Sequence, residues 1–179
     1  MMEVVSGLKN VRYEADCALS VGSFDGLHLG HQRILKRMRE TGRRVTIVTF
    51  DPHPQAVVKP EHRPPPLLTS FDERLELFDK LGVDRLIIVR FDREFANLSP
   101  EDFVAKVLVD QIGLSYIFVG PNHGFGHQRE GDVTLLHGLG DKYHFKVVVV
   151  GAVMRFGLKI SSSRIRKLLA EGDVLMTWR

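Results

Sequence analysis

Short apolar segments alternate with amphipathic segments along most of the chain, and this alternation limits the possible folds more than any other feature of the sequence. The apolar segments are rich in β-branched residues and predict strands at residues 17–21, 45–50, 85–90, 116–119 and 146–150. The amphipathic segments predict helices at residues 29–41, 71–81, 100–112, 132–143 and 162–171. Because such alternation is typical of a parallel sheet covered on both faces, we expect an α/β, doubly wound, Rossmann-like fold.

Local signals mark the ends of the expected elements. Ser70 and Glu73 have the spacing of a capping box at the start of the second helix, and Gly82 follows as its stop. Two long loops are expected, over residues 51–68 and 121–131. Long loops in a compact domain are usually functional or disordered, so both are candidates for a site.

Composition excludes several classes of protein. The 179 residues, 44% of them hydrophobic and 26% charged, suffice for one domain, which we expect over residues 1–179. No run approaches the ~20 apolar residues of a membrane span. Cys17 is the only cysteine, which rules out an intrachain disulfide and a cysteine zinc cluster, and we expect a cytoplasmic location. The net charge of +3 suits a protein that handles phosphates, but no long Lys/Arg block suggests a nucleic-acid partner.

The segment G-S-F-D-G-L-H-L-G-H, residues 22–31, follows the first expected strand and opens the first expected helix. Its glycines permit tight turns and a close backbone approach, and a helix N-terminus attracts anions. His28 and His31 are three residues apart, so we expect their side chains to point the same way and to donate hydrogen bonds to a phosphate. The alternatives are a surface turn with incidental histidines and half of a metal site.

The segment I-S-S-S-R-I-R, residues 160–166, opens the last expected helix. Its serines can cap the helix and donate hydroxyl hydrogen bonds to phosphate, and the guanidinium of Arg166 can hold a phosphate with two bonds. Taken alone, this segment is better interpreted as an N-cap followed by a basic, solvated helix. Its pairing with the histidine motif favours phosphate binding.

Two further segments follow strand ends: T-F-D-P-H-P at 49–54 and F-D-R-E-F-A-N-L-S-P-E-D-F-V at 91–104. We interpret the second as scaffold, with phenylalanines that pack. Together with the two motifs above, and over residues 21–174, they resemble the adenylyltransferase module of prokaryotic FAD synthetases, the bifunctional riboflavin kinase/FMN adenylyltransferases. The H-x-G-H signature is similar to that of the wider nucleotidyltransferase superfamily, so the resemblance implies a nucleotidyltransferase type of fold.

The resemblance implies a role for each motif. It implies catalytic roles for His28 and His31. It implies an ATP site made of Gly22, Phe24, Asp25, Gly26, Gly30, Ser162, Ser163 and Arg166. It implies an acceptor site made of Phe50, Pro52, His53, Asn122, His123, Phe125 and Arg129. Mg²⁺ is expected to accompany ATP, and the sequence does not name its ligands.

The resemblance therefore implies an FMN adenylyltransferase, which transfers AMP from ATP to FMN and yields FAD and pyrophosphate by in-line displacement. One alternative keeps the chemistry but uses CTP or another phosphorylated acceptor. A second alternative is a flavin- or nucleotide-binding module without catalysis. The expected partners are ATP and FMN, with neither nucleic acid nor a membrane, and the sequence predicts no oligomeric state.

The acceptor loop departs from the family pattern. Members usually read V-G-x-D-F-R-F-G-x-x-R-x-G-D, whereas residues 119–132 read V-G-P-N-H-G-F-G-H-Q-R-E-G-D. Asn122, His123 and Gly124 replace the usual Asp, Phe and Arg, which removes a cation from the region associated with the flavin. His123, His127 and Arg129 are candidates to compensate for it. Because the sequence ends a few residues after the last expected helix, we expect either a stand-alone adenylyltransferase or a truncated or separated module, with no riboflavin kinase domain and no kinase activity.

Overall fold

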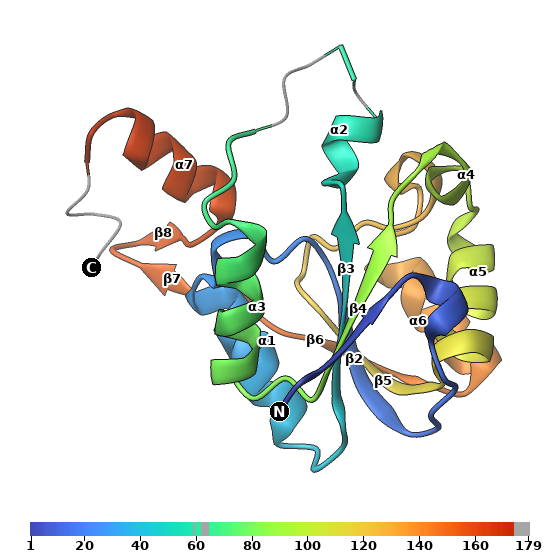
Figure 1. Cartoon of the computed structure of the whole chain (residues 1–179). Coiled ribbons are helices and arrows are strands. Elements are labelled where there is room, and N and C mark those ends of the chain that lie inside the picture. Colours follow the sequence, from blue (N-terminus) through green and yellow to red (C-terminus); the bar gives the residue numbers. More distant parts are fainter. Residues whose placement is uncertain (59, 62–64, 174–179) are drawn as a thin grey trace.

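A six-stranded sheet lies at the centre of the computed structural model, which describes residues 1–58, 60–61 and 65–173 (Figure 1). Its strand order is β1-β4-β3-β2-β5-β6, and all neighbouring strands are parallel. The strands are β1 (Glu3–Ser6), β2 (Cys17–Val21), β3 (Val45–Asp51), β4 (Arg85–Arg90), β5 (Leu114–Val119) and β6 (Lys146–Val149). The prediction of an α/β fold with a parallel sheet is confirmed.

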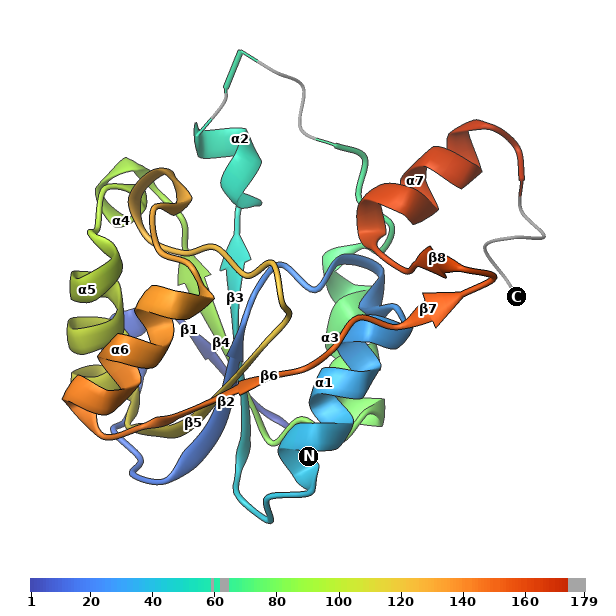
Figure 2. The ribbon, with the colours of Figure 1, turned by 180° about the vertical axis from the view of Figure 1, so that it is seen from behind.

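Helices cover both faces of the sheet (Figures 1 and 2). The α-helices are α1 (Leu29–Arg39), α2 (Pro54–Val58), α3 (Phe71–Lys80), α4 (Arg93–Ala96), α5 (Pro100–Asp102), α6 (Val133–Tyr143) and α7 (Ser162–Ala170). The other elements are the short helices η1 (Leu8–Asn10), η2 (Asp25–Leu27) and η4 (His127–Arg129), the π-helix η3 (Phe103–Ile112), and a hairpin of β7 (Met154–Arg155) and β8 (Leu158–Lys159). Helices α1 and α3 lie on one face, and η3 and α6 lie on the other.

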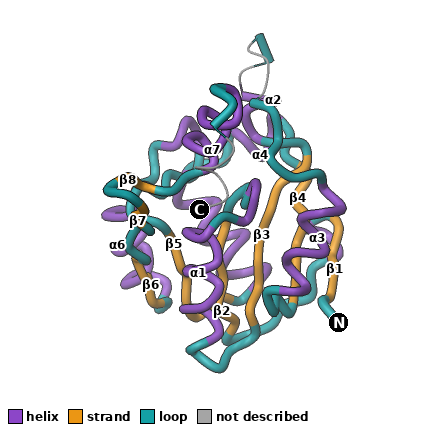
Figure 3. Tube along the Cα trace, turned by 90° about the vertical axis from the view of Figure 1, so that its left-hand side faces the viewer, coloured by secondary structure: helices purple, strands orange, loops and turns teal. Residues whose placement is uncertain are grey.

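The winding of the chain reverses at β2. From β2 the chain proceeds to β3 and β4 on one side, and it later returns to β5 and β6 on the other. Figure 3 views the sheet through the layer of α1 and α3 and shows this order of the strands. Helices α2, α4 and α7 lie above the sheet in this view. In open parallel sheets, ligands bind beyond the carboxyl ends of the strands next to such a reversal. The fold therefore places a site where β2 and β5 end.

The two faces of the sheet bury separate hydrophobic clusters. Cys17, Leu19 and Val21 of β2 face the cluster beneath η3 and α6, whereas Ala18 faces the cluster beneath α1 and α3. This is the two-residue alternation of a strand. All five residues of β2 are buried, which explains why this central strand reads as a continuous apolar run.

The helix predicted over residues 100–112 is partly wrong. Only its first turn, α5, is α-helical, and η3 continues it with wider π-helical winding. At its end the N–H of Gly113 donates to the carbonyl of Leu108, five residues back, at 3.0 Å. Gly113 has φ +88°, and a Cβ there would lie 2.6 Å from the carbonyl oxygen of Glu14. The contact of Gly113 with the distant residue Glu14 thus fixes where the helix ends. The local hydrophobic periodicity carries no information about that contact.

The other predicted helices and strands are found, with ends displaced by at most two residues. Ser70 and Glu73 form both bonds of the predicted capping box. The sequence interpretation missed β1, the β7–β8 hairpin and the short helices α2 and α4. Residues 59 and 62–64 of the first long loop lie outside the described residues, as does the end of the chain from residue 174.

Candidate functional site

Two cavities open near the carboxyl ends of the strands, and His28 lines both of them. The larger, of about 920 Å³, is bordered by the ends of β2, β3 and β4, by the loop after β5 and by the start of α7. The smaller, of about 570 Å³, lies between the turn after β2, the β7–β8 hairpin and α7. Two ligand-sized spaces therefore meet at one imidazole.

The turn between β2 and α1 has a conformation that depends on glycine. Gly26 has φ +77°, and a Cβ there would lie 2.8 Å from the Cδ1 atom of Leu68. At Gly30, within the first turn of α1, a Cβ would lie 3.0 Å from Cε1 of His28. Phe24 also has a positive φ, 49°, and its ring is buried. The turn is therefore held close to Leu68, with the ring of His28 directly over Gly30.

The two histidines of the motif form a stacked pair. Their ring centroids are 3.7 Å apart at an interplanar angle of 16°, and the ring of Phe24 lies 5.1 Å from that of His31. His28 borders the cavities, whereas His31 stands behind it and lines neither. The expectation that the two side chains point the same way is confirmed.

Burial determines the charge of this pair. It lowers the pKa of His28, and burial together with the neighbouring His28 lowers the pKa of His31 to about 3. Both rings are thus neutral near pH 7, and each carries one N–H donor and one acceptor nitrogen. The Nδ1 atoms of both rings are buried without a hydrogen-bond partner in the described part of the chain. His28 thus presents a neutral ring at the junction of the cavities, and the neutral ring of His31 is stacked behind it.

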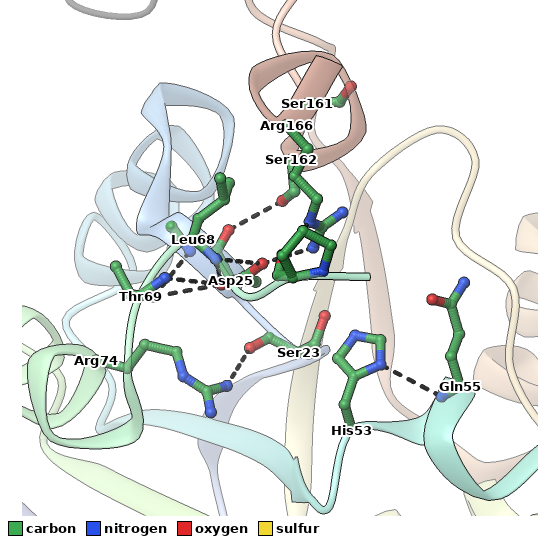
Figure 4. A network of polar contacts seen from close by, with 12 residues as sticks. Ser23, Asp25, His53, Gln55, Leu68, Thr69, Arg74, Ser161, Ser162 and Arg166 are labelled. Carbon is green, nitrogen blue, oxygen red and sulfur yellow. Dashed lines mark hydrogen bonds and ion pairs between the residues drawn. The ribbon is translucent and has the colours of Figure 1, made fainter. Parts of the chain in front are cut away.

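Asp25 connects the turn to two distant segments (Figure 4). Its carboxylate, with a side chain 1% exposed, accepts hydrogen bonds from the N–H groups of Leu68 at 2.9 Å and Thr69 at 3.2 Å. It also pairs with Arg166 of α7 at 2.5 Å. Burial opposes the charged form of Asp25, but these bonds outweigh it and hold the pKa below its ordinary value. Hydrogen bonds and an ion pair with other parts of the protein therefore occupy the carboxylate of Asp25.

The start of α7 is attached to the same turn. The hydroxyl of Ser162 donates to the carbonyl of Asp25 at 2.9 Å, and Nε of Arg166 donates to the carbonyl of Pro66 at 2.8 Å. Ser161 caps the helix by accepting from the N–H of Arg164 at 3.3 Å. These bonds bring Ser162, Ser163 and Arg166 to the wall of the larger cavity.

An aromatic wall forms one side of the larger cavity. The rings of Phe50, Phe91 and Phe95 contact one another with centroids 5.3 to 5.9 Å apart, and Phe95 contacts Phe103 at 5.8 Å. Phe125 continues the wall, with its centroid 6.3 Å from that of Phe103. Such a surface is suited to a flat, conjugated ligand.

Polar groups from the loop after β5 lie beside this wall. The ring of His123 stacks on Phe125 with centroids 5.8 Å apart at 20°, and burial with the nearby Arg129 lowers the pKa of His123 to about 4. His53, from the loop after β3, also lines the cavity, and its Nδ1 accepts from the N–H of Gln55 at 3.3 Å. Burial, followed by the charge of Arg166, lowers the pKa of His53.

The structure brings most of the predicted site residues together. Those that line a cavity are Gly22, Gly26, His28, Phe50, His53, His123, Phe125, Arg129, Ser162, Ser163 and Arg166. Phe24, Asp25, Gly30 and His31 lie behind these walls and support them. The remaining two, Pro52 and Asn122, are exposed and line neither cavity.

The sequence interpretation missed part of both walls. Phe91, Phe95 and Phe103, which it assigned to scaffold, also face the larger cavity. Phe156 and Leu158 of the β7–β8 hairpin line the smaller one. A signal existed for the phenylalanines, because their segment follows a strand end. The two-residue strands of the hairpin are too short to give one.

Neither a metal site nor a membrane span is found in the described residues. No group of three or more His, Cys, Asp or Glu side chains within them is arranged to hold a metal ion. No helix among the residues described is long and apolar enough to cross a bilayer. The two histidines of the motif are thus not completed to a metal site by described neighbours.

Comparisons with known proteins agree with the motifs. A family model described as FAD synthetase matches residues 10–164. The bifunctional riboflavin kinase/FMN adenylyltransferase of Escherichia coli (strain K12) is 33% identical over 181 residues, which cover 98% of this chain and 58% of that protein. The protein of the same name from Pseudomonas fluorescens is 36% identical over 177 residues, covering 96% and 56%. The chain thus spans a little more than half the length of these relatives.

Solved structures share the fold at lower sequence identity. A protein described as a macrolide-efflux protein from Streptococcus pneumoniae superposes with a TM-score of 0.86 at 23% identity, over 99% of this chain and 60% of that one. The pantoate-beta-alanine ligase of Francisella tularensis gives a TM-score of 0.62 at 14% identity, over 99% and 85%. At these identities the likeness concerns the fold alone.

Proposed function

Because the chain belongs to the FAD synthetase family, we propose that it is an FMN adenylyltransferase, which transfers AMP from ATP to FMN and releases pyrophosphate. The observation that carries the proposal is the position of His28, whose imidazole lies where two cavities meet. A transferase that joins two large substrates needs their reacting ends at one point. His28 marks that point, and its neutral ring is a hydrogen-bond donor suited to a phosphate.

In the proposed complex the nucleoside of ATP occupies the smaller cavity. The apolar side chains of Phe156, Leu158, Ile165 and Leu168 line this cavity and suit a purine. The triphosphate then passes His28 and the N-terminus of α1, whose free N–H groups favour an anion. Ser162, Ser163 and Arg166 lie beyond this point, where they would hold the leaving pyrophosphate.

FMN is proposed to occupy the larger cavity. Its ring system would lie against the phenylalanine wall, and its phosphate would point toward His28, which is shared by both spaces. The volume of about 920 Å³ is within the range of pockets that enclose ligands of this size. This arrangement brings the FMN phosphate to the α-phosphorus of ATP.

The proposed chemistry is a direct displacement. An oxygen of the FMN phosphate attacks the α-phosphorus in line, its new P–O bond forms as the bond to the β-phosphate oxygen breaks, and pyrophosphate leaves. Negative charge grows on the α-phosphate oxygens, where the N–H of His28 would stabilise it, and His31 would support that ring from behind. Because burial keeps both rings neutral, they can stack without repulsion between two cations. Positioning and preorganised donors suffice, and no covalent enzyme intermediate is required.

Magnesium enters this proposal as part of the substrate. The described residues contain no group of three possible metal ligands, and the carboxylate of Asp25 is already bonded to Arg166 and two N–H groups. Mg²⁺ commonly keeps several waters and binds to nucleotide phosphates. We therefore propose MgATP as the nucleotide substrate and the cytoplasm, where MgATP is abundant, as the location.

The test is incubation of the purified chain with MgATP and FMN, followed by chromatography for FAD and an assay for pyrophosphate. His28→Ala should lower turnover by about 10²-fold, as the loss of one preorganised donor does elsewhere. His137→Ala, a change at an exposed residue of α6, should leave it unchanged. Near-normal FAD formation by the His28 variant would contradict the mechanism.

A panel of substrates separates the remaining alternatives. AMP transfer to a mononucleotide or phosphopantetheine in place of FMN, or nucleotidyl transfer from CTP, would contradict the proposed substrates but retain the chemistry. Tight flavin binding without release of pyrophosphate would instead indicate a binding module.

A further inference from the structure

A buried cation, Arg74 of α3, lies behind the turn that leads to His28. Arg74 is 6% exposed, and its Nη1 donates to the carbonyl of Ser23 at 2.9 Å. Its Nε is buried without a hydrogen-bond partner in the described part of the chain. Burial of a charge costs free energy unless partners compensate for the lost solvation. One bond to a carbonyl is a small compensation for a guanidinium with five N–H donors.

The charge of Arg74 is not neutralised by its surroundings. Among the residues that the structure describes, no carboxylate forms an ion pair with it. The ring of Phe71, 5.6 Å from the guanidinium carbon, carries no charge. Asp25, beside the same turn in Figure 4, is already paired with Arg166. Two guanidinium groups and one carboxylate therefore leave positive charge in excess around the turn.

This positive charge acts on the larger cavity. Ser23 lines that cavity together with His53 and Arg166, and Figure 4 shows Arg74 and His53 on opposite sides of Ser23. Burial, followed by the charge of Arg166, lowers the pKa of His53, and the charge of Arg74 acts in the same direction. Arg74 thus adds positive charge to the wall of the cavity although its own side chain does not line it.

The hydrogen bond from Arg74 also holds the backbone of the turn. Ser23 precedes Phe24, whose φ of 49° lies in the left-handed region that costs an L-residue free energy. The ring of Phe24 lies 5.1 Å from that of His31, on which the ring of His28 is stacked. The bond to Ser23 therefore supports the segment that positions the histidine pair.

We infer that Arg74 is a positioning residue for the triphosphate of the nucleotide: from behind Ser23 it holds the turn before His28 and supplies a buried positive charge that the phosphates balance. This inference rests on the proposed function, because it takes MgATP as the nucleotide whose phosphates pass His28. The unpaired guanidinium costs free energy in the free chain, and part of that cost is recovered when the anion binds. Recognition of the triphosphate then depends partly on a residue that does not touch it.

The experiment measures the binding of MgATP and of adenosine, which share the nucleoside and differ by the triphosphate, by calorimetry. Arg74→Gln keeps a side-chain donor but removes the charge, and it should raise the Kd of MgATP by about tenfold, as expected for the loss of one charge from a partly buried site. Arg74→Lys keeps the charge and should restore most of the affinity. Adenosine affinity should stay constant in both variants, which also reports that the cavities are intact.

The chain offers a matched control on the same helix. Lys80→Gln removes a positive charge at an exposed site of α3, where Lys80 pairs with Glu76 at 3.2 Å, and it should bind MgATP as the unaltered chain does. NMR titration of the His53 ring reports directly whether the charge of Arg74 reaches the cavity. Arg74→Gln should raise the pKa of His53, because a nearby positive charge is removed, and Arg74→Lys should leave it as it is.

Three results would overturn the inference: an equal loss of MgATP and adenosine affinity in Arg74→Gln, an Arg74→Lys variant that binds MgATP as weakly as Arg74→Gln, or an unchanged pKa of His53 in Arg74→Gln. Each is distinct from failure of the proposed function. A chain whose affinity for MgATP depends on the charge of Arg74 but which forms no FAD would contradict the proposed reaction and still support this inference.

Discussion

Burial and hydrogen-bond partners together decide which side chains of this site are charged and which are neutral. His28 and His31 are kept neutral because burial lowers the pKa of each ring, whereas Asp25, with a side chain 1% exposed, is kept ionised by two backbone N–H groups and Arg166. The difference lies in the partners, since a buried group stays charged only where hydrogen bonds and an opposite charge compensate for lost solvation. The neutral ring of His28 thus faces both cavities, His31 lies behind it, and the charged pair lies beside it.

The lowered pKa of His31 predicts how stability depends on pH. In the unfolded chain this histidine takes up a proton near pH 6.5, but in the folded chain it does so only near pH 3. Above pH 6.5 both states are neutral at this residue and it contributes nothing. Below pH 6.5 the unfolded state binds more protons, so the free energy of unfolding should fall with decreasing pH, by up to about 1.4 kcal/mol per pH unit.

Urea unfolding between pH 4.5 and 7.5 measures this slope. His31→Gln should flatten it, and His137→Gln, on the exposed side of α6, should leave it as in the unaltered chain. Comparison of slopes removes any constant loss of stability caused by the substitution. An unchanged slope in His31→Gln would mean that another group causes the acid sensitivity.

Among the secondary-structure elements, the start of α1 carries the histidine pair and leaves little room for an added side chain. The helix begins where the ring of His28 folds back over Gly30, and that ring is stacked on His31 one turn later. At the other side of the turn, Ser162 and Arg166 tie α7 to Asp25. The turn is thereby fixed from the helix that follows it and from a helix more than 130 residues away.

Two glycines in helices allow one substitution to be compared in two surroundings. Gly30→Ala should leave α1 intact but press on the ring of His28, which has little room to move, and we expect FAD formation to fall by about tenfold, less than the loss of a whole donor. Gly138→Ala in α6 meets nothing within 4 Å and should stabilise the protein by about 0.5–1 kcal/mol without a change in rate.

Rates of FAD formation and melting temperatures of the two variants check this prediction. A normal rate in Gly30→Ala would show that the position of the His28 ring does not limit the reaction.

In the whole molecule, the layered fold determines where ligands can bind. The sheet reverses its winding between β2 and β5, and the segments that follow these strands build both cavities together with α7. The folded chain itself forms both cavities from distant segments, so each substrate should bind the folded state and not the unfolded one.

MgATP and FMN should each raise the stability of the protein when added separately, by about 2.7 kcal/mol at a concentration of 100 times Kd. Arg166→Gln should reduce the rise in melting temperature caused by MgATP, and Arg33→Gln, an exposed change on α1, should not. Each shift is measured within one variant, with and without ligand. A chain that is stabilised by neither substrate would argue against both binding sites.

Local patterns were sufficient for most elements and for the motif residues. The apolar run of β2 and the capping box at Ser70 were readable because strand burial and helix capping depend on residues close in sequence. The π-helical winding of η3 could not be predicted in this way, because the helix ends where Gly113 contacts Glu14, about a hundred residues away. The β7–β8 hairpin is too short to have a detectable period.

The sequence alone predicted the residues that we propose to carry the chemistry, which are the histidine pair and the serines and Arg166 of α7, and it predicted most of the strands and helices that present them. Only the tertiary structure decided how these residues are used. It placed His31 behind His28, directed the carboxylate of Asp25 to Arg166, exposed three phenylalanines to a cavity and buried the guanidinium of Arg74. The physical reason is that side-chain type and spacing are local properties, whereas burial, pairing and steric room arise only where distant segments meet.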